Sequence, residues 1–306
     1  MIGLSRFFVP VKAYSLQKRI LIIINPVSGI SNKERIRHVL HEKLHGSHLD
    51  YTVMFSEFPG HGTQLANEAS ENGLDAIVVV GGDGSVNEVA KGLVNTNVAL
   101  GIIPTGSGNG LAHFLHIPFN LSKAIDNIKA FRIKKIDTFT INGHFGCNLS
   151  GVGFDAKVAV EFSKVKRRGF WSYFRIVLQE YLTYESQNYV LEFNGKTYNR
   201  KALMVCFANS NQFGNNAVIA PGASADDGLI DICVISKVPL VEAPVMGTML
   251  ISRLINKTHY AEYFKTHEVI LHKPQSEALH IDGDPVDTDN TIHVKVNPLS
   301  LNVIVP

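Results

Sequence analysis

The chain has 306 residues, of which 45% are hydrophobic and 18% are charged, a composition typical of a globular protein. This length predicts two domains, each large enough to bury a core. The formal net charge of +2 is too small to indicate a nucleic-acid-binding protein. Three widely spaced cysteines, Cys147, Cys206 and Cys233, form no C-x-x-C pair. Their spacing argues against a disulfide framework or a zinc site and favours the cytoplasm.

Two apolar stretches bear on membrane contact. Residues 7–9 are too short to be the hydrophobic part of a secretory signal. Residues 238–254 are interrupted by Glu242, Pro244 and Arg253 and fall short of the roughly 20 apolar residues that span a bilayer. We interpret this second stretch as a core helix. Any membrane contact is then expected to be peripheral, at the inner face.

The first half of the chain alternates strand and helix patterns. Four apolar, β-branched runs predict buried strands at residues 20–24, 51–55, 76–80 and 98–103. Helical patterns fall between them, at residues 31–44, 64–71 and 86–93. Strand–turn–helix units in series predict an α/β domain with a parallel sheet and helices on both faces.

The second half is richer in strands. Strand-like runs occur at residues 136–141, 189–193, 202–207, 229–235, 268–271 and 292–296. Helical patterns are fewer, at residues 157–164 and 171–184 and in the stretch 238–254. This half predicts a β-sandwich-like domain. We therefore expect an α/β domain over residues 1–135 and a β-rich domain over residues 136–298.

A glycine turn, Gly81-Gly82-Asp83-Gly84-Ser85, follows one buried strand and precedes a helix. Phosphates bind at such turns because backbone N–H groups and the helix N-terminus favour anions. A bare carboxylate repels phosphate, so Asp83 fits this setting if it holds a Mg²⁺ ion or a water molecule. The alternative is a structural turn in which Asp83 caps a helix.

Two further polar turns follow other strands of the same predicted sheet, at residues 25–29 and 104–109. Because the carboxyl ends of parallel strands share one sheet edge, the three turns are expected to meet there. No Walker-type G-x-x-x-x-G-K-[ST] motif occurs. Residues 195–197 read GKT, but the first glycine of the motif would fall at position 190, which is Val190.

Together, these motifs resemble those of a known protein family. GGDGSVNEV at residues 81–89, with NPVSG at 25–29 and PTGSGNGLA at 104–112, resembles the diacylglycerol/sphingosine kinase superfamily of lipid kinases. Further segments extend it over nearly the whole chain: Ser56 with Gly60 and His61, GVGFDA at 151–156, residues 219–231 with their DDGLID end, and DGD at 282–284.

The resemblance implies a phosphofructokinase-like N-terminal domain that binds ATP with Mg²⁺, and a cleft for the lipid headgroup. It also suggests that residues 299–306 return to the first domain. The positions that match nucleotide-binding segments are Asn25, Pro26, Ser28, Gly29, Ser56, Gly81, Gly82, Gly84, Ser85, Glu88, Gly106, Ser107 and Asn109.

The resemblance places the general base at Asp284, the third residue of DGD, and gives Asp83 a catalytic role. Similar kinases carry glutamate at the position of Asp284, so the side chain here is one methylene shorter. From the residues alone, a glycine-centred hairpin with solvated aspartates is the alternative.

Three other carboxylates receive implied roles. Asp226 and Asp227 resemble the carboxylates that hold a structural Mg²⁺, and a turn capped by aspartates is the alternative. Asp155 resembles a lipid-headgroup contact, and an N-cap for the following helix is the alternative.

These observations favour an ATP-dependent lipid kinase. The alternatives are another GGDG-type kinase acting on NAD or a sugar phosphate, and a catalytically silent lipid- or nucleotide-binding protein. Residues 109–113 read NGLAH and not the NDFAR common in bacterial diacylglycerol kinases, so we expect a sphingoid base to compete with diacylglycerol. The basic run at residues 164–168 suits an anionic membrane surface or a solvated helix end. A homodimer stays open.

Overall fold

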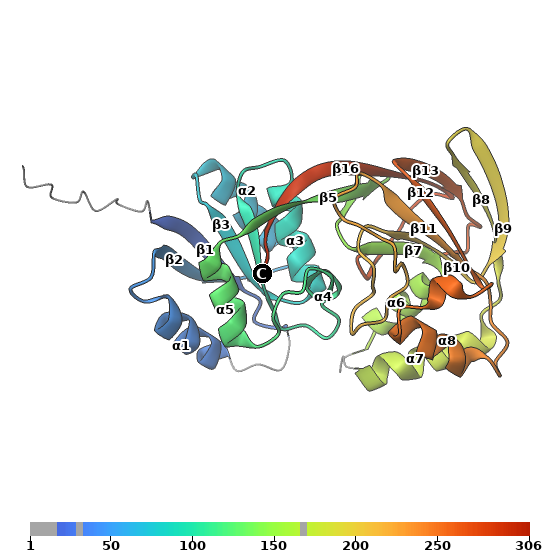
Figure 1. The fold of residues 1–306 in the computed structure, drawn as a ribbon, viewed down its shortest axis with the longest axis horizontal. Coiled ribbons are helices and arrows are strands. Elements are labelled where there is room, and N and C mark those ends of the chain that lie inside the picture. The colour runs from blue at the N-terminus through green and yellow to red at the C-terminus, as the bar shows by residue number, and fades with distance from the viewer. Residues whose placement is uncertain (1–16, 29–32, 166–169) are drawn as a thin grey trace, which may run out of the picture.

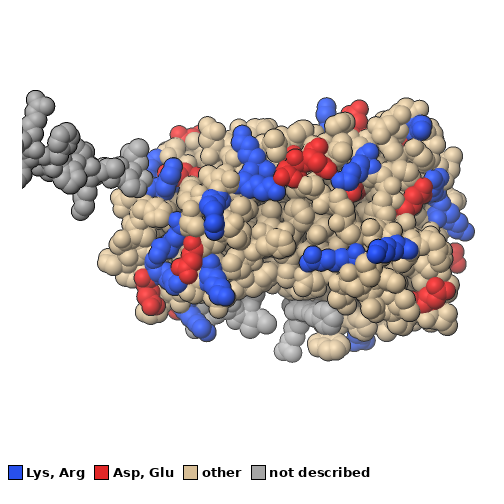
Figure 2. Space-filling view, viewed as in Figure 1, with Lys and Arg blue, Asp and Glu red and all other residues tan. Residues whose placement is uncertain are grey.

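The computed structural model describes residues 17–28, 33–165 and 170–306. Gly29 and most of the basic run at residues 164–168 lie outside these ranges. Figure 1 shows two lobes side by side along the long axis, the first built from the N-terminal half and the second from most of the rest. On the face seen in Figure 2, lysine and arginine side chains are spread over both lobes, with aspartate and glutamate among them.

The first lobe contains a parallel sheet with strand order β2-β1-β3-β4. Its strands are β1 (Lys18–Ile24), β2 (Leu49–Phe55), β3 (Ala76–Gly81) and β4 (Ala99–Pro104). Every residue of β3 and β4 is buried, as expected for central strands that are covered on both faces. The predicted parallel sheet with helices on both faces is therefore confirmed.

Two helix layers cover this sheet. Helices α1 (Lys33–Leu44) and α5 (Leu121–Ala130) pack on the face that carries Ile20, Ile22 and Ile24. Helices α2 (His61–Glu71) and α3 (Asp83–Leu93) pack on the opposite face, against Leu21 and Ile23. This alternation follows from the two-residue period of a strand. The short helix α4 (Gly110–Phe114) follows β4.

The second lobe is a sandwich of two mainly antiparallel layers. One layer is a six-stranded sheet with the order β12 (Ala261–Thr266), β11 (Ile230–Ile235), β10 (Met204–Ala208), β7 (Leu149–Gly153), β14 (Leu279–Ile281), β15 (Asp284–Val286). The other contains β13 (Glu268–His272), β8 (Gln187–Phe193) and β9 (Lys196–Ala202). A shared apolar core joins the layers and includes Phe139, Leu191, Phe207 and Ile232.

A two-stranded ribbon links the lobes and forms the long arch in Figure 1. It pairs β5 (Ile133–Ile141) with β16 (Thr291–Ile304), and β5 also pairs with the short β6 (His144–Gly146). Strand β16 pairs antiparallel with β13 near its start and parallel with β4 at Asn302 and Val303. One sheet therefore runs through both lobes, and the predicted division after residue 135 falls inside this ribbon.

Three helices cover the outer face of the six-stranded sheet: α6 (Phe154–Ser163), α7 (Phe170–Thr183) and α8 (Ala243–Ile251), followed by the single turn η1 (Ile255–Lys257). The expectation of a core helix over residues 238–254 is wrong. The helix begins only at Ala243, after Pro239, and none of its residues is buried. Among the described residues, no helix is long and apolar enough to cross a bilayer.

Candidate active site

The first glycine turn joins β3 to α3 at the carboxyl edge of the parallel sheet. Close packing explains its composition. A Cβ atom on Gly81 would lie 2.6 Å from the Cβ of Ser85, and one on Gly106 would lie 2.5 Å from the Cα of Gly82. Side chains are thus excluded where the first and second glycine turns touch. The backbone is left accessible to a ligand at a helix N-terminus.

Hydrogen bonds tie the turn after β1 to both glycine turns. The Asn25 side-chain amide donates to Ser85 Oγ at 2.7 Å, and the hydroxyls of Ser28 and Thr105 lie 3.2 Å apart. Pro26 is exposed in this turn. The backbone N–H of Ser56 donates to Ile24 and places Ser56 beside the same edge. The three turns therefore meet, as the sequence predicts.

Lys33 adds a positive charge that sequence reasoning missed. Its ammonium group donates a hydrogen bond to the carbonyl of Ser28, and partial burial lowers its pKa. A cation at the edge of these turns suits an anionic ligand. The signal was weak because a lysine at the start of a helix is common on protein surfaces.

The second glycine turn is closed by Asn109. Its side chain accepts from the backbone N–H of Gly106 at 3.0 Å and donates to the Gly106 carbonyl at 2.6 Å. Asn109 is buried in a left-handed conformation, which asparagine tolerates well. The carbonyl of Ser107 accepts from the side chain of Asn215, so a loop of the second lobe rests on this turn.

Asp83 joins the two glycine turns and does not face an open ligand position. Its two oxygens accept from the backbone N–H groups of Asn109 and Gly110, each at 2.7 Å. Burial raises the pKa of Asp83 to about 6, even though these two donors favour the ionised form. This differs from the prediction that Asp83 holds Mg²⁺ or water. The acidic residue instead positions the start of α4.

Glu88 also serves a neighbouring helix. Its carboxylate accepts from the backbone N–H groups of Gly60 and Gly62 at 2.9 Å and 3.2 Å, at the start of α2. Anions stabilise helix N-termini because unpaired N–H groups gather there. The structure therefore places Glu88 in support of the site, while its predicted contact with nucleotide stays a prediction.

The β14–β15 hairpin brings a carboxylate from the second lobe onto the first glycine turn. Its two-residue turn is Asp282-Gly283, with φ values of 52° and 93°. The next residue, Asp284, is exposed, and its Oδ2 would lie 3.5 Å from a Cβ atom on Gly84. The predicted base thus lies over the first turn of α3, beside the predicted phosphate site.

Asp282 fixes this hairpin in place. Its buried carboxylate accepts from the Asn87 side chain at 2.7 Å and from the backbone N–H groups of Cys147, Asn148 and Leu149 at 2.9 to 3.1 Å. Asn87 belongs to α3, whereas the other donors lie at and before β7. One carboxylate therefore anchors the hairpin to both lobes. Sequence reasoning did not assign it this role.

Asp155 is not open to a ligand in the structure. It lies at the start of α6, is buried, and accepts from the backbone N–H of Ala156 at 2.8 Å. Its other oxygen lies 3.1 Å from Nε2 of His280 and 3.2 Å from Sγ of Cys206. The predicted headgroup role therefore lacks support from this geometry, which instead pairs Asp155 with a buried histidine.

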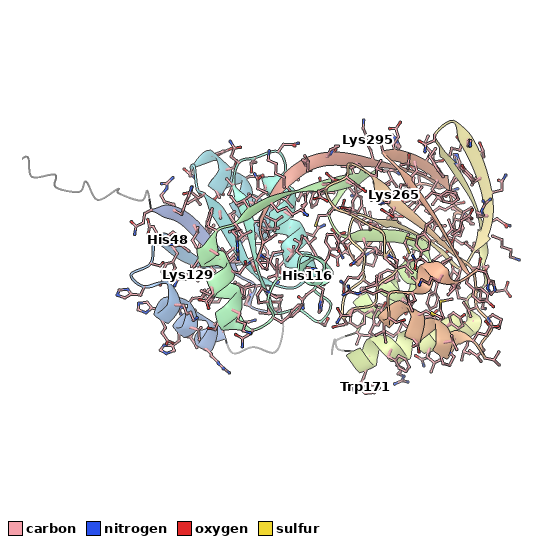
Figure 3. The ribbon with its side chains drawn as sticks, in the orientation of Figure 1. His48, His116, Lys129, Trp171, Lys265 and Lys295 are labelled. Atoms are coloured by element: carbon pink, nitrogen blue, oxygen red, sulfur yellow. The ribbon has the colours of Figure 1, made fainter. Side chains whose placement is uncertain are left out.

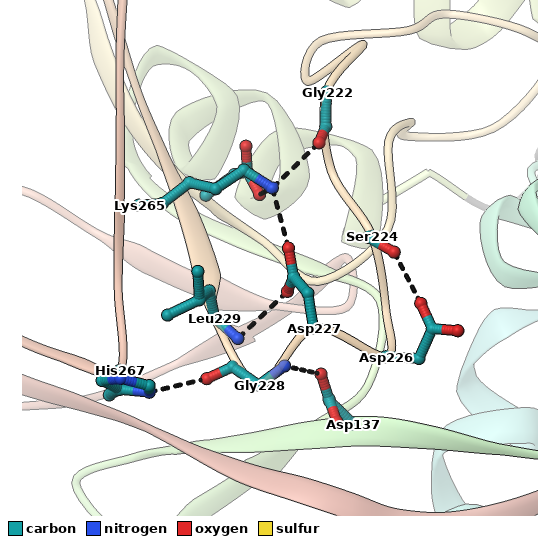
Figure 4. Close-up of polar contacts among 10 residues, drawn as sticks. Asp137, Gly222, Ser224, Asp226, Asp227, Gly228, Leu229, Lys265 and His267 are labelled. Carbon is teal, nitrogen blue, oxygen red and sulfur yellow. Dashed lines mark hydrogen bonds and ion pairs between the residues drawn. The ribbon is translucent and has the colours of Figure 1, made fainter.

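Asp226 and Asp227 face different partners, as Figure 4 shows. Asp226 accepts from the Ser224 hydroxyl and pairs with Lys134 at 2.9 Å, and these two contacts hold its pKa below the usual range. Asp227 pairs with Lys265 at 2.9 Å and accepts from the Leu229 backbone. The two carboxylates do not converge on a common point.

Lys265 belongs to β12 and lies against the segment at residues 222–229, which carries Asp226 and Asp227 and which we call the acidic loop. It also contacts Asp231 at 3.2 Å and the Gly222 carbonyl at 3.0 Å. Burial works against its charge, but Asp227 and Asp231 raise its pKa overall. No group of three or more His, Cys, Asp or Glu side chains within the described ranges could hold a metal ion. The residues predicted as metal ligands therefore do not fit a shared metal site.

Comparisons with known proteins agree with this fold and site. Residues 19–141 match the family model of the diacylglycerol kinase catalytic domain, and residues 149–305 match the YegS C-terminal NAD kinase beta sandwich-like domain. A diacylglycerol kinase of Bacillus subtilis is 28% identical, covering 87% of this chain and 90% of the relative. A probable YegS-like lipid kinase of Chromohalobacter salexigens is 27% identical, covering 80% of each chain.

Solved structures show the same fold. A putative diacylglycerol kinase from Bacillus anthracis has a TM-score of 0.79 at 21% identity, covering 95% of this chain and 98% of that one. The fold and the family matches define a lipid kinase. The chain belongs to the family of bacterial lipid kinases that join a diacylglycerol kinase catalytic domain to a YegS-type β-sandwich domain. Membership of a kinase family implies that ATP is used.

Proposed function

We propose that this kinase transfers the γ-phosphate of ATP to the hydroxyl group of a diacylglycerol or of a sphingoid-type lipid, with Asp284 as the general base. The observation that carries the proposal is the position of Asp284 over Gly84. A carboxylate from the second lobe thereby adjoins the turn that we propose holds phosphate. Phosphoryl transfer needs these two parts close together.

The phosphates of ATP bind at the three turns. The N-terminus of α3 and the backbone of both glycine turns supply N–H donors, and Lys33 supplies positive charge beside Ser28. Asp226 and Asp227 do not fit a shared metal site, so a Mg²⁺ ion would be held by the nucleotide phosphates and water, where it would neutralise phosphate charge. Asp284 accepts the proton of the attacking hydroxyl.

The lipid reaches the enzyme from a bilayer surface through α7 and the segment before α8. On α7, on α8 and in the segment before α8, eight apolar or aromatic side chains are at least half exposed, and we call them the apolar face: Trp171, Phe174, Leu178, Leu182, Leu240, Val241, Val245 and Ile251. An open hollow of about 410 Å³ joins the two segments, lined by Leu182, Leu240 and the cationic Lys237 among others. Apolar side chains beside a cation suit a membrane with anionic headgroups.

One layer of packing separates the apolar face from the start of α6. The ring of Phe154, which precedes Asp155, contacts the ring of Tyr181 on α7 at 5.6 Å and the ring of Tyr184, just after α7, at 5.8 Å between centroids. Figure 3 shows Trp171 at the outer end of the same helix, pointing away from the lobe. A lipid held at α7 thus lies near the start of α6.

A transfer assay with labelled ATP tests the function. Diacylglycerol, a sphingoid base, a ceramide, NAD and fructose 6-phosphate are offered in parallel, the lipids in anionic vesicles. We expect label only in the lipids, with the sphingoid base competing with diacylglycerol. Label in NAD or the sugar phosphate alone would overturn the lipid assignment. A complete lack of transfer, with ATP bound, would indicate a silent binding protein.

A further inference from the structure

A row of neighbouring residues crosses three strands beneath the start of α6. Gly151 of β7 pairs with His280 of β14 on one side and with Cys206 of β10 on the other. Paired residues of adjacent strands present their side chains on one face of the sheet. Gly151 has no side chain, and a Cβ atom there would lie 2.2 Å from Oδ2 of Asp155. The glycine therefore makes room for the Asp155 carboxylate between His280 and Cys206.

The contacts of His280 identify its tautomer. Its Nε2 atom lies 3.1 Å from a carboxylate oxygen of Asp155, which only accepts hydrogen bonds. Its Nδ1 atom lies 3.2 Å from the backbone nitrogen of Gly283, which only donates. The neutral ring with its proton on Nε2 satisfies both contacts. Asp155 and His280 are 9% and 3% exposed, so water does not compete for them.

The second contact reaches the catalytic hairpin. Gly283 is the second residue of the two-residue turn, and Asp284 follows directly. Both turn residues have positive φ, the conformation that type I′ turns require. An acceptor for the Gly283 N–H therefore helps to set where the Asp284 carboxylate points.

We propose that Asp155 and His280 are positioning residues for Asp284, an inference that rests on the proposed role of Asp284 as general base. Asp155 holds the imidazole in the tautomer whose Nδ1 accepts from Gly283. The Gly283 N–H, held in this way, fixes the Asp284 carboxylate over the first turn of α3. In this arrangement Asp155 acts on the base through His280 and does not bind the lipid headgroup.

Two substitutions of His280 separate its two contacts. In His280→Asn the side-chain oxygen occupies roughly the place of Nδ1, so it can accept from Gly283 but cannot reach Asp155. In His280→Gln the amide reaches Asp155, but no acceptor remains near Gly283. His280→Asn loses the buried contact with the Asp155 carboxylate, whereas His280→Gln loses the part-buried contact with Gly283, so His280→Asn should be the less stable variant. The two variants therefore differ in which contact they keep, and a larger loss of kcat in His280→Gln would run against the order of their stabilities.

The positioning role predicts unequal kinetics. His280→Gln should lower kcat by about 100-fold at unchanged KM for ATP, because misplacing a catalytic group by about 1 Å costs that much. His280→Asn should retain kcat within about fivefold of the wild type. If the loss of kcat in each variant instead follows its loss of unfolding temperature, His280 has only a structural role and the proposal is overturned.

His272, whose side chain is 43% exposed, provides a control away from the hairpin. Its Nδ1 lies 3.1 Å from the Thr291 hydroxyl and its Nε2 lies 3.4 Å from a carboxylate oxygen of Glu192, on strands away from the hairpin. His272→Asn and His272→Gln should both keep the wild-type kcat. A difference between these two controls as large as that at position 280 would show that the Asn–Gln contrast does not report on the hairpin.

Asp155→Asn tests the other half of the pair. In the wild-type background it should lower kcat while leaving the KM for lipid unchanged, whereas a headgroup contact would raise that KM. In the His280→Asn background it should have no further effect on kcat, since the histidine is no longer there to be oriented. A raised KM for lipid in both backgrounds would overturn the positioning role.

A spectroscopic measurement separates this inference from the proposed function. The ¹⁵N chemical shifts of His280 should show a protonated Nε2 and an unprotonated Nδ1 at neutral pH, and Asp155→Asn should shift them. The opposite tautomer would overturn the proposal even in an active enzyme. Failure of the wild type to phosphorylate any lipid, with the expected tautomer present, would instead remove the proposed function and the role of the pair with it.

Discussion

The Oδ1 atom of Asp83 lies 2.7 Å from the backbone nitrogen of Gly110, and this contact couples the first glycine turn to the second. The partner oxygen accepts from Asn109 at the same distance. One carboxylate at the start of α3 therefore holds the start of α4. The Asp83 carboxylate therefore couples the positions of the two helix starts that border the proposed phosphate site.

Asp83→Asn should uncouple the two turns. An asparagine can accept from only one of the two N–H groups, and its own NH₂ group then faces the other donor. We expect kcat to fall by about 100-fold through misalignment of the phosphates. The free energy of unfolding should change much less, because loss of the hydrogen bonds is offset by removal of a buried charge. Steady-state kinetics and urea unfolding measure the two effects, and wild-type turnover would rule out the coupling.

The raised pKa of Asp83 predicts a specific pH dependence. Burial raises this pKa to about 6 from an ordinary value of 3.8. Between these values the folded state keeps a proton that the unfolded state has lost, so the contribution of Asp83 to stability decreases as pH rises from about 4 to 6 and is constant above that. Urea unfolding of the wild type should show this decrease relative to Asp83→Asn. Parallel curves for the two proteins would contradict it.

Gly110→Ala should disrupt the same junction sterically. A Cβ atom at position 110 would lie 2.6 Å from Nδ2 of Asn148 and 3.1 Å from the carbonyl oxygens of Gln212 and Phe213. Because two of these three atoms are backbone, the loop of the second lobe must move. We expect the unfolding free energy to fall by about 1–3 kcal/mol and the KM for ATP to rise. Gly222→Ala serves as a control for loss of a glycine, at a turn where nothing lies within 4 Å and where φ is not positive.

Asp284→Asn should remove the base without unfolding the protein. Since the side chain is exposed, the unfolding temperature should stay close to that of the wild type. We expect kcat to fall by about 1,000-fold, within the range for loss of a general base. Asp284→Glu, which restores the residue usual in similar kinases, should keep most of the activity. The control is Asp287→Asn, because Asp287 is also exposed and also follows the hairpin turn. Equal losses of kcat at both positions would refute a special role for Asp284.

The sequence predicted much of the fold because its signals are local. Buried β-branched runs such as Ala76–Gly81 and glycine turns at strand ends identify a parallel sheet without any long-range information. The meeting of the three turns followed from the geometry of parallel strands. Helix α8 could not be predicted correctly, because an apolar sequence does not tell whether its side chains face a core or the outside.

The site was harder to predict where its contacts join distant segments. Asp282 and Asn87 are 195 positions apart, and Asp155 and His280 are 125 apart. Motif resemblance marked Asp83 and Asp155 as important. It could not distinguish a carboxylate that faces a ligand from one that holds a neighbouring turn, since the residue type is the same in both cases. Only the donors around each side chain make that distinction.

Lys265→Met tests whether the acidic loop depends on an internal cation. Loss of the ammonium group leaves Asp227 and the buried Asp231 without it, and the unfolding free energy should fall by about 1–3 kcal/mol. Thermal unfolding of the nucleotide-free wild type should respond neither to EDTA nor to Mg²⁺. A clear stabilisation of the wild type by Mg²⁺ alone would restore the metal role predicted for Asp226 and Asp227.

The apolar face predicts how the enzyme meets its lipid. Leu182→Asp and Val241→Asp should each weaken sedimentation with vesicles of anionic phospholipid by about 10-fold or more, because each removes a side chain that would be buried in the lipid and adds a charge there. Turnover on a short-chain acceptor dispersed as monomers should fall far less than turnover on vesicles. Ile133→Asp provides the control, since Ile133 is 48% exposed but lies at the start of the interlobe ribbon. If all three variants bind vesicles equally, α7 and the segment before α8 do not form the membrane contact, and the lipid must reach Asp284 by another face.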